Sequence, residues 1–174
     1  IWLTLKKILD NKRLVREKTS SDYQQEFRQI FMQLQSGMDY IEWAEIYQKI
    51  ISWELKIDHS NSNEMADILS QQKKEANAAF CKYISGIYPH WMKNPSEGPV
   101  KSFNLLREKV FSHIQPECPT ILLVLDNLRF DQWKVIEPIL LERFKLQNED
   151  YFFSILPTAT QYSRNAIFAG MMPA

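Results

Sequence analysis

The segment TILLVLDN, residues 120–127, marks the point at which the hydrophobic pattern of the chain changes. An apolar run begins there after Pro119 and stops at Asp126. Such a run is too short for a helix and is typical of a strand that is buried on both faces of a parallel sheet. The segment YFFSIL, residues 151–156, is a second run of this kind. We therefore predict two strands of one sheet.

A helix is predicted between the two strands. The segment DQWKVIEPILLERF, residues 131–144, has helical spacing of its apolar residues, and Pro138 requires a kink or an early first turn. Strand, helix and strand together span about 35 residues, the length of one βαβ unit. The connection in such a unit is right-handed, so its strands run parallel.

The sequence before this unit has the pattern of helices. Apolar residues recur at helical spacing in three segments, which are 19–36, 40–51 and 62–88. Asp39 and Glu42 have the spacing of a capping box. We predict a bundle of three antiparallel helices.

Three breaks are expected around these helices. The cluster IDHSNSN, residues 57–63, is predicted to form a turn, and Pro89 is predicted to end or kink the third helix. The segment KNPSEGP, residues 93–99, has two prolines, one glycine and no other apolar residue, so it is predicted to be the joint between domains. We place the bundle at residues 19–94, and a linker with a short helix at 95–118.

Composition excludes several classes of protein. The 174-residue chain has a formal net charge of zero, which gives no reason to propose a nucleic-acid or acidic-membrane surface. No apolar run is long enough for membrane insertion. Cys81 and Cys118 lack the spacing of a metal site and are expected to be reduced thiols of a cytoplasmic protein. The chain starts at Ile1 rather than Met and stops at Ala174 after an apolar pattern, so we expect a fragment.

The predicted βαβ unit brings chemically useful side chains to one edge of the sheet. The first strand ends in Asp126, and Thr158 and Thr160 follow the second strand. Ligands of open α/β sheets bind at this edge. A threonine hydroxyl is a weak nucleophile unless a base, a metal or a positive field activates it. The N-terminus of the next helix binds anions, and Arg164 and Asn165 are candidate phosphate ligands.

Each of these residues also has a plain structural explanation. Threonine before a helix is usually an N-cap, and Asp126 after a buried strand is as compatible with a turn as with a metal site. Arg129 and Arg164 are equally compatible with solvated or paired surface positions. The three histidines are expected at surface or cap positions. The spacing alone therefore leaves both interpretations open.

Two motifs resemble a known superfamily. LLVLDNLRFDQW, residues 122–133, resembles the first metal-ligand motif of the alkaline phosphatase superfamily, and LPTATQYSRNAIFAGMMP, residues 156–173, resembles its nucleophile segment. Together they are most similar to the PglZ branch and to PorX-type response regulators of type IX secretion. The segment LKKILDNKRLVREKTSSDYQQEFRQIF, residues 5–31, is similar to the junction between receiver domain and helical bundle in those proteins.

The resemblance implies a fold and site residues. It implies a mainly α chain, in which a three-helix bundle precedes the first βαβ part of an alkaline-phosphatase-like domain at 119–174. Asp126 matches a zinc ligand, and Thr160 matches the metal-bound nucleophile, with Thr158 the weaker choice. Related phosphodiesterases have a phosphate-binding Asn three residues after the nucleophile, where this chain has Ser163, so Arg164 and Asn165 are the candidates left for that role.

The resemblance also implies a cellular context. Residues 1–18 would end the receiver domain and form a connecting helix. The whole protein would be a zinc-dependent phosphodiesterase or phosphatase that acts on a phosphate ester or nucleotide and regulates type IX secretion. Its expected partners are a histidine kinase, secretion-regulation proteins and a second copy in a homodimer.

Two further expectations concern activity. A two-zinc site needs several Asp and His ligands, and no histidine follows His113. We therefore expect this fragment to lack a complete metal site and hydrolase activity. The alternative function is a non-catalytic helical relay that transmits receiver phosphorylation to dimerisation or to a partner.

Overall fold

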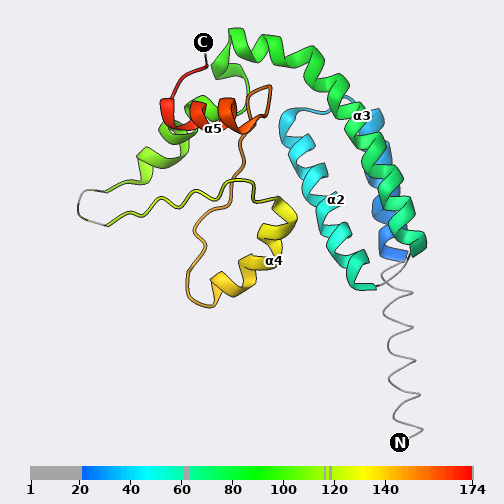
Figure 1. The fold of residues 1–174 in the computed structure, drawn as a ribbon. Helices are drawn as coiled ribbons and strands as arrows, with labels where there is room; N and C mark the ends of the chain where they lie inside the picture. The colour runs from blue at the N-terminus through cyan, green and yellow to red at the C-terminus, as the bar shows by residue number, and fades with distance from the viewer. Residues whose placement is uncertain (1–20, 61–62, 116, 118, 174) are drawn as a thin grey trace, which may run out of the picture. The chain divides into compact units, whose positions relative to one another are not determined.

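The computed structural model describes residues 21–60, 63–115, 117 and 119–173. The chain divides into two compact units, Ile1–Ile87 and Tyr88–Ala174, which we call the helical unit and the second unit. Helices dominate both (Figure 1). The mainly α class is therefore confirmed. The predicted connecting helix at 1–18 lies outside the described residues.

The helical unit contains a helix over residues 21–35, α2 (Tyr40–Ser60) and most of α3 (Asn63–Lys93). The predicted capping box starts α2. The Asp39 carboxylate accepts hydrogen bonds from the backbone N–H groups of Ile41 and Glu42, each at 2.9 Å. The Glu42 carboxylate accepts one from the Asp39 N–H at 2.9 Å. Three predicted helices are thus confirmed.

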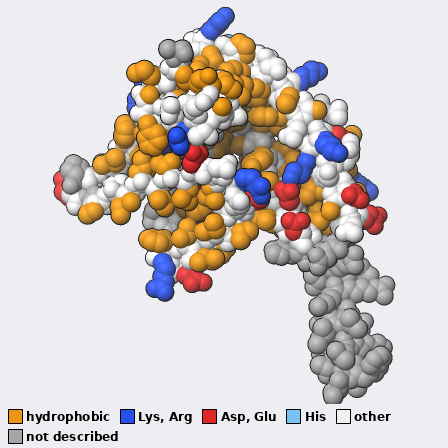
Figure 2. Space-filling model, viewed as in Figure 1, with side chains coloured by type: hydrophobic (Ala, Val, Ile, Leu, Met, Phe, Trp, Pro, Cys, Tyr) orange, Lys and Arg blue, Asp and Glu red, His pale blue; other side chains and the backbone are white. Residues whose placement is uncertain are grey.

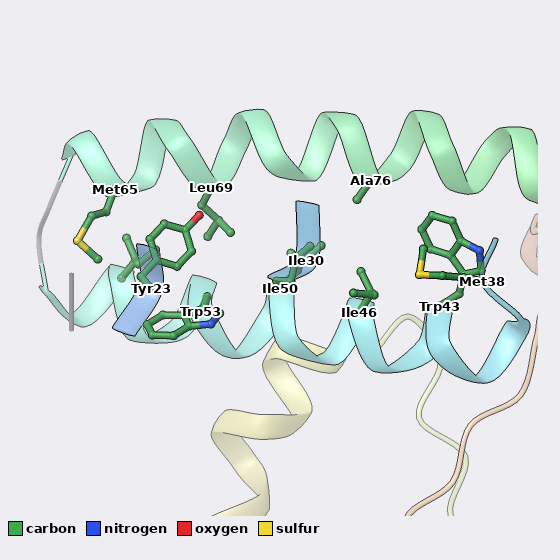
Figure 3. Close-up of a cluster of buried hydrophobic side chains, with 11 residues drawn as sticks. Tyr23, Ile30, Met38, Trp43, Ile46, Ile50, Trp53, Met65, Leu69 and Ala76 are labelled. Carbon is green, nitrogen blue, oxygen red and sulfur yellow. The ribbon is translucent and has the colours of Figure 1, made fainter. Parts of the chain in front are cut away.

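One hydrophobic core joins these helices. The ring centroids of Tyr23 and Trp53 are 5.1 Å apart, and those of Trp43 and Phe80 are 5.2 Å apart. Burial of each large apolar side chain contributes about 1.5–3 kcal/mol relative to exposure. Figure 3 shows the buried side chains of this core between the helices. They are Tyr23, Ile30, Met38, Trp43, Ile46, Ile50, Trp53, Ile57, Met65, Leu69 and Ala76.

Two helices continue past residues where the sequence predicts a break, and a kink at Pro89 stays a prediction. The helix α2 continues to Ser60 through most of the predicted turn, because Ile57 is buried in the core and packing outweighs the poor helix propensity of the residues after it. Pro89 lies inside α3, which continues to Lys93. A proline costs a helix interior about 3 kcal/mol. The burial of Trp91 in the next turn offsets that cost.

The second unit begins with the last turn of α3 and the predicted joint. The segment after α3 contains a short 3-10 turn, Pro95–Glu97. Lys101 is fully buried and donates hydrogen bonds to the carbonyls of Pro95 and Pro99, at 3.4 and 3.0 Å. Burial lowers the pKa of Lys101.

An isolated parallel bridge between Lys101 and Phe153 joins segments far apart in the sequence. The Phe153 N–H donates to the Val100 carbonyl at 2.8 Å, and the Ser102 N–H donates to the Phe153 carbonyl at 3.2 Å. The Phe153 ring packs edge-on against Trp91, with centroids 5.7 Å apart.

Short and regular helices complete the second unit. The predicted short helix is a series of irregular turns, Ser102–Asn104, Leu106–Val110 and Phe111–His113. The helix predicted at 131–144 is confirmed as α4 (Phe130–Leu141), with Pro138 inside it, and a last helix, α5, spans Thr160–Ala169.

The βαβ part is not visible as strands in the described residues. Residues 120–125 and 151–156 flank α4, but the Lys101–Phe153 bridge is the one β-interaction of the described chain. The apolar side chains of 121–125 are exposed, from 44% at Val124 to 91% at Ile121. Figure 2 shows many hydrophobic side chains on the face of the molecule in view. A strand requires a hydrogen-bonded neighbouring strand, and no bridge of the described residues involves 121–125.

Candidate functional site

Asp126 and Arg164, which are 38 positions apart in sequence, meet in an ion pair. The guanidinium Nη1 lies 3.0 Å from the Asp126 carboxylate oxygen Oδ2. Both side chains are about half exposed. The turn after residues 120–125 places Asp126, and Asn127 in this turn has φ 60°, a left-handed conformation that Asn tolerates better than most residues. The ion pair therefore brings α5, which carries Arg164, close to the turn that carries Asp126.

Thr160 is the first residue of α5 and is exposed. The N-cap is Ala159, and no side chain caps the helix. The capping role that the sequence suggests for the threonines is therefore absent from this helix start. The first backbone N–H groups of a helix lack partners within the helix and attract anions. Thr160 is thus located at the N-terminus of α5, where the backbone N–H groups favour a bound phosphate.

The helix geometry separates the two candidate phosphate ligands. Residues four apart lie on the same helix face, so Arg164 shares the face of Thr160. Asn165 is rotated about 140° from Thr160 around the helix axis. The arrangement favours Arg164 over Asn165 as the partner of an anion near Thr160.

The segment that leads into α5 is hydrogen-bonded to Tyr88, and the two ends of the helix have defined backbone conformations. The Leu156 N–H donates to the hydroxyl of Tyr88 at 2.9 Å, and the Leu156–Pro157 peptide bond is cis. At the other end, Gly170 ends α5 with φ 66°, and its N–H donates to the Ala166 carbonyl at 3.0 Å.

Ser163 has a role that the sequence reasoning missed. Its hydroxyl lies 3.0 Å from the hydroxyls of both Ser102 and Ser154. The side chain is 7% exposed and belongs to the inner face of α5. The position noted as a departure from related phosphodiesterases therefore makes contacts inside the protein. The signal in the sequence is the helical spacing: Ser163 lies three residues before Ala166, so both belong to the same buried face of α5.

Most of the acids that follow Asp126 are bonded to basic side chains. Glu149 accepts hydrogen bonds from Lys134 Nζ, at 2.8 and 2.9 Å, and from the Trp133 indole at 2.9 Å. Asp150 pairs with Lys109. The hydrogen bonds from Lys134 lower the pKa of Glu149, and the hydrogen bond from Lys109 lowers the pKa of Asp150. These carboxylates connect the segment at 149–150 to α4 and to the turn at Leu106–Val110.

The described residues do not fit a complete zinc site. No group of three His, Cys, Asp or Glu side chains lies together in the described part of the chain. Structural and catalytic zinc sites take about four donors. Asp126 is bonded to Arg164, Asp131 is bonded to Arg129 at 2.6 Å, and His90 is bonded to Glu97 at 2.7 Å.

Comparison with known families gives two matches. Residues 13–92 match the model described as the PorX response regulator linker domain. Residues 105–174 match the model described as the BREX system PglZ alkaline phosphatase-like domain. Together these matches confirm the resemblance to a PorX-type response regulator with a PglZ domain. No curated protein matches the chain. In the residues searched, no helix has the length and apolar character needed to span a bilayer.

Proposed function

We propose that residues 105–174 are the nucleophile-bearing part of a phosphodiesterase or phosphatase, and that residues 13–92 link it to a receiver domain. One observation carries the proposal. Asp126 pairs with Arg164, which lies on the same face of α5 as the exposed Thr160, within the segment that matches the PglZ model. A hydroxyl nucleophile, a guanidinium and a carboxylate suited to a metal are groups that phosphoryl transfer through a threonine can use.

Each residue has a defined task in the proposed reaction. The Thr160 hydroxyl loses its proton and attacks phosphorus, the bond from phosphorus to the ester oxygen breaks, and the alcohol leaves with a proton. Water then attacks the phosphorus of the phospho-threonine, which releases the phosphate product and restores the Thr160 hydroxyl. The amides at the start of α5 and the Arg164 guanidinium bind the phosphoryl oxygens and stabilise their developing charge. Arg164 leaves its ion pair with Asp126 in order to do so.

Zinc belongs to the proposal as the cofactor of the full-length protein. Bound at Asp126, zinc would supply a Lewis acid that lowers the pKa of the Thr160 hydroxyl. Asp126 is the described residue suited to hold it, and further ligands would have to come from outside the described residues. We expect the 174-residue chain itself to be inactive, and its zinc titration to show no pair of tight sites.

A non-catalytic relay is the second candidate function. The match of residues 13–92 to a response regulator linker favours it, because that segment has its own buried core. In this function the helical unit transmits phosphorylation to dimerisation or to a partner in type IX secretion. A histidine kinase would be the upstream partner, and a cytoplasmic location suits the exposed free thiol of Cys81.

Substitution of Thr160 in the full-length protein separates the two functions. For the enzyme, Thr160→Ala and Thr160→Val are expected to abolish hydrolysis of bis-p-nitrophenyl phosphate and to leave the circular dichroism spectrum unchanged. Thr158→Ala is the matched control and should retain most activity. Full activity of the Thr160 variants, combined with lost partner binding, would support the relay instead.

A further inference from the structure

Three serine hydroxyls form a cluster under the first turn of α5. Ser163 is its centre, with its Oγ 3.0 Å from the Oγ atoms of Ser102 and Ser154. The Ser102 Oγ also accepts a hydrogen bond from the Ile155 N–H at 3.2 Å. The cluster therefore connects α5 to the turn at 102–104 and to the segment at 154–155.

These three pieces of backbone are the ones that position Thr160. The turn at 102–104 follows the bridge between Lys101 and Phe153, and the segment 154–155 leads into α5. Ser163 lies one helical turn after Thr160. A shift of any of the three pieces would therefore move Thr160.

The polar character of the cluster needs an explanation, because it is buried. Ser102 is fully buried and Ser163 nearly so. A buried hydroxyl costs free energy unless it is hydrogen-bonded, and an apolar residue such as the neighbouring Ala166 packs at this face without that cost. Hydrogen bonds are directional, so they fix the rotation of α5 about its axis in a way that packing of small side chains does not.

We infer that Ser163 is a positioning residue, whose hydroxyl holds the first turn of α5 through Ser102 and Ser154 so that Thr160 and Arg164 face the reacting phosphate. This inference rests on the proposed function, since it assigns Thr160 the role of nucleophile. It also gives Ser163 a task other than phosphate binding, because its hydroxyl is engaged inside the protein.

Amide hydrogen exchange of the full-length protein tests the positioning without any assay of activity. The Tyr162 N–H bonds to the Ala159 carbonyl at 2.9 Å, and the Gly170 N–H at the far end of α5 is the internal reference. We expect Ser163→Ala and Ser154→Ala to speed exchange at Tyr162 about 5- to 10-fold relative to Gly170. Ser154→Thr keeps a hydroxyl and should restore the wild-type rate.

Kinetics provide the second readout. The same alanine variants should lower kcat for bis-p-nitrophenyl phosphate about 10- to 100-fold, with KM nearly constant, because misplacement of a nucleophile affects the transition state most. Ser112→Ala, at an exposed serine of the same unit, should leave both kcat and exchange unchanged. Recovery of kcat by Ser154→Thr separates positioning from simple loss of stability.

Failure of the inference is distinct from failure of the proposed function. Wild-type exchange at Tyr162 in both alanine variants would overturn the positioning role, whether or not the protein hydrolyses the ester. If Ser163→Ala does not fold, Ser154→Ala decides, because Ser154 is the exposed member of the cluster. A wild-type protein that hydrolyses no phosphate ester would overturn the proposed function, and altered exchange would then still support the cluster as a structural clamp.

Discussion

The helical unit buries aromatic and aliphatic side chains from three helical segments in one core, whereas the second unit depends on directional polar contacts. Its segments are joined by the serine cluster, by the buried Lys101 and by ion pairs such as Lys134–Glu149. Its α4 has no buried residue, and many of its apolar side chains are exposed. The comparison shows that the helical unit is stabilised mainly by apolar area removed from water, whereas the second unit combines a few buried apolar side chains, such as Trp91 and Ile155, with directional hydrogen bonds.

The largest effect is expected from the core of the helical unit. Trp53→Ala removes a buried indole that packs on Tyr23, and should lower the free energy of unfolding by about 3–5 kcal/mol. Urea denaturation followed by circular dichroism measures this. Met32→Ala, at a 63% exposed position, is the control and should cost less than about 0.5 kcal/mol. Equal costs for the two variants would contradict the assigned core.

A smaller but specific effect is expected at Gly98. A β-carbon there would lie 2.6 Å from Cγ and Cδ1 of the buried Trp91. Gly98→Ala should therefore destabilise the second unit by about 1–3 kcal/mol through overpacking. Gly86→Ala is the matched control, because its β-carbon meets nothing within 4 Å and should stabilise α3 by about 0.5–1 kcal/mol. Thermal unfolding of both variants compares the signs, and a stabilising Gly98→Ala would show that Trp91 is free to move.

The capping box should have an effect of intermediate to small size. Asp39→Ala removes the acceptor of two backbone N–H groups and should cost about 1 kcal/mol. Glu45→Ala, at an exposed position within α2, should stay within about 0.5 kcal/mol of wild type. The urea midpoint of each variant gives the measurement, and an unchanged midpoint for Asp39→Ala would argue against the cap.

The smallest effect is expected from the ion pairs of the second unit, and it depends on pH. The pKa values of Glu149 and Asp150 are lowered in the folded state, so their stabilisation is present above the ordinary pKa. It is lost as the pH falls from about 4 through the lowered values. Each pair contributes less than about 1 kcal/mol because it is partly exposed.

Amide exchange at residues 145–153, compared with residues 43–57 of α2, tests this pH dependence. As the pH falls, amide protection, which is the exchange rate corrected for its intrinsic pH dependence, should decrease in the first segment before it decreases in the second. In Glu149→Gln the response to acid at 145–153 should be weaker than in wild type. If acid lowered amide protection equally at 145–153 and at 43–57 in the wild-type protein, the ion pairs would not account for a difference in acid stability between the two units.

The sequence predicted the helices well because their signals are local. The Asp39–Glu42 capping box and the apolar spacing in the first three helices act within a few residues, and both are confirmed. The continuation of two helices past a predicted break has a different origin. Ile57 and Trp91 are buried by residues distant in sequence, and that burial extends each helix past its local stop signal.

The candidate site could be predicted from the sequence less completely than the helices. The motif at 126 and the helix start at 160 have short sequence signatures, so their importance was visible. The Asp126–Arg164 pair and the contacts of Ser163 depend on how α5 packs, which no local pattern encodes. The strands at 120–125 and 151–156 are predicted from apolar runs, but pairing also requires a neighbouring strand, which a run of residues does not specify.

The proline inside α3 has a consequence for the movement of the chain. Pro89 has no N–H, so the carbonyl one turn earlier, at Ser85, loses its usual donor in the helix. Helices bend most readily at such a missing bond. The boundary between the two units falls at residues 87 and 88, within this weakened turn. The helix thus crosses the boundary between the two units at a turn that lacks one of its backbone hydrogen bonds.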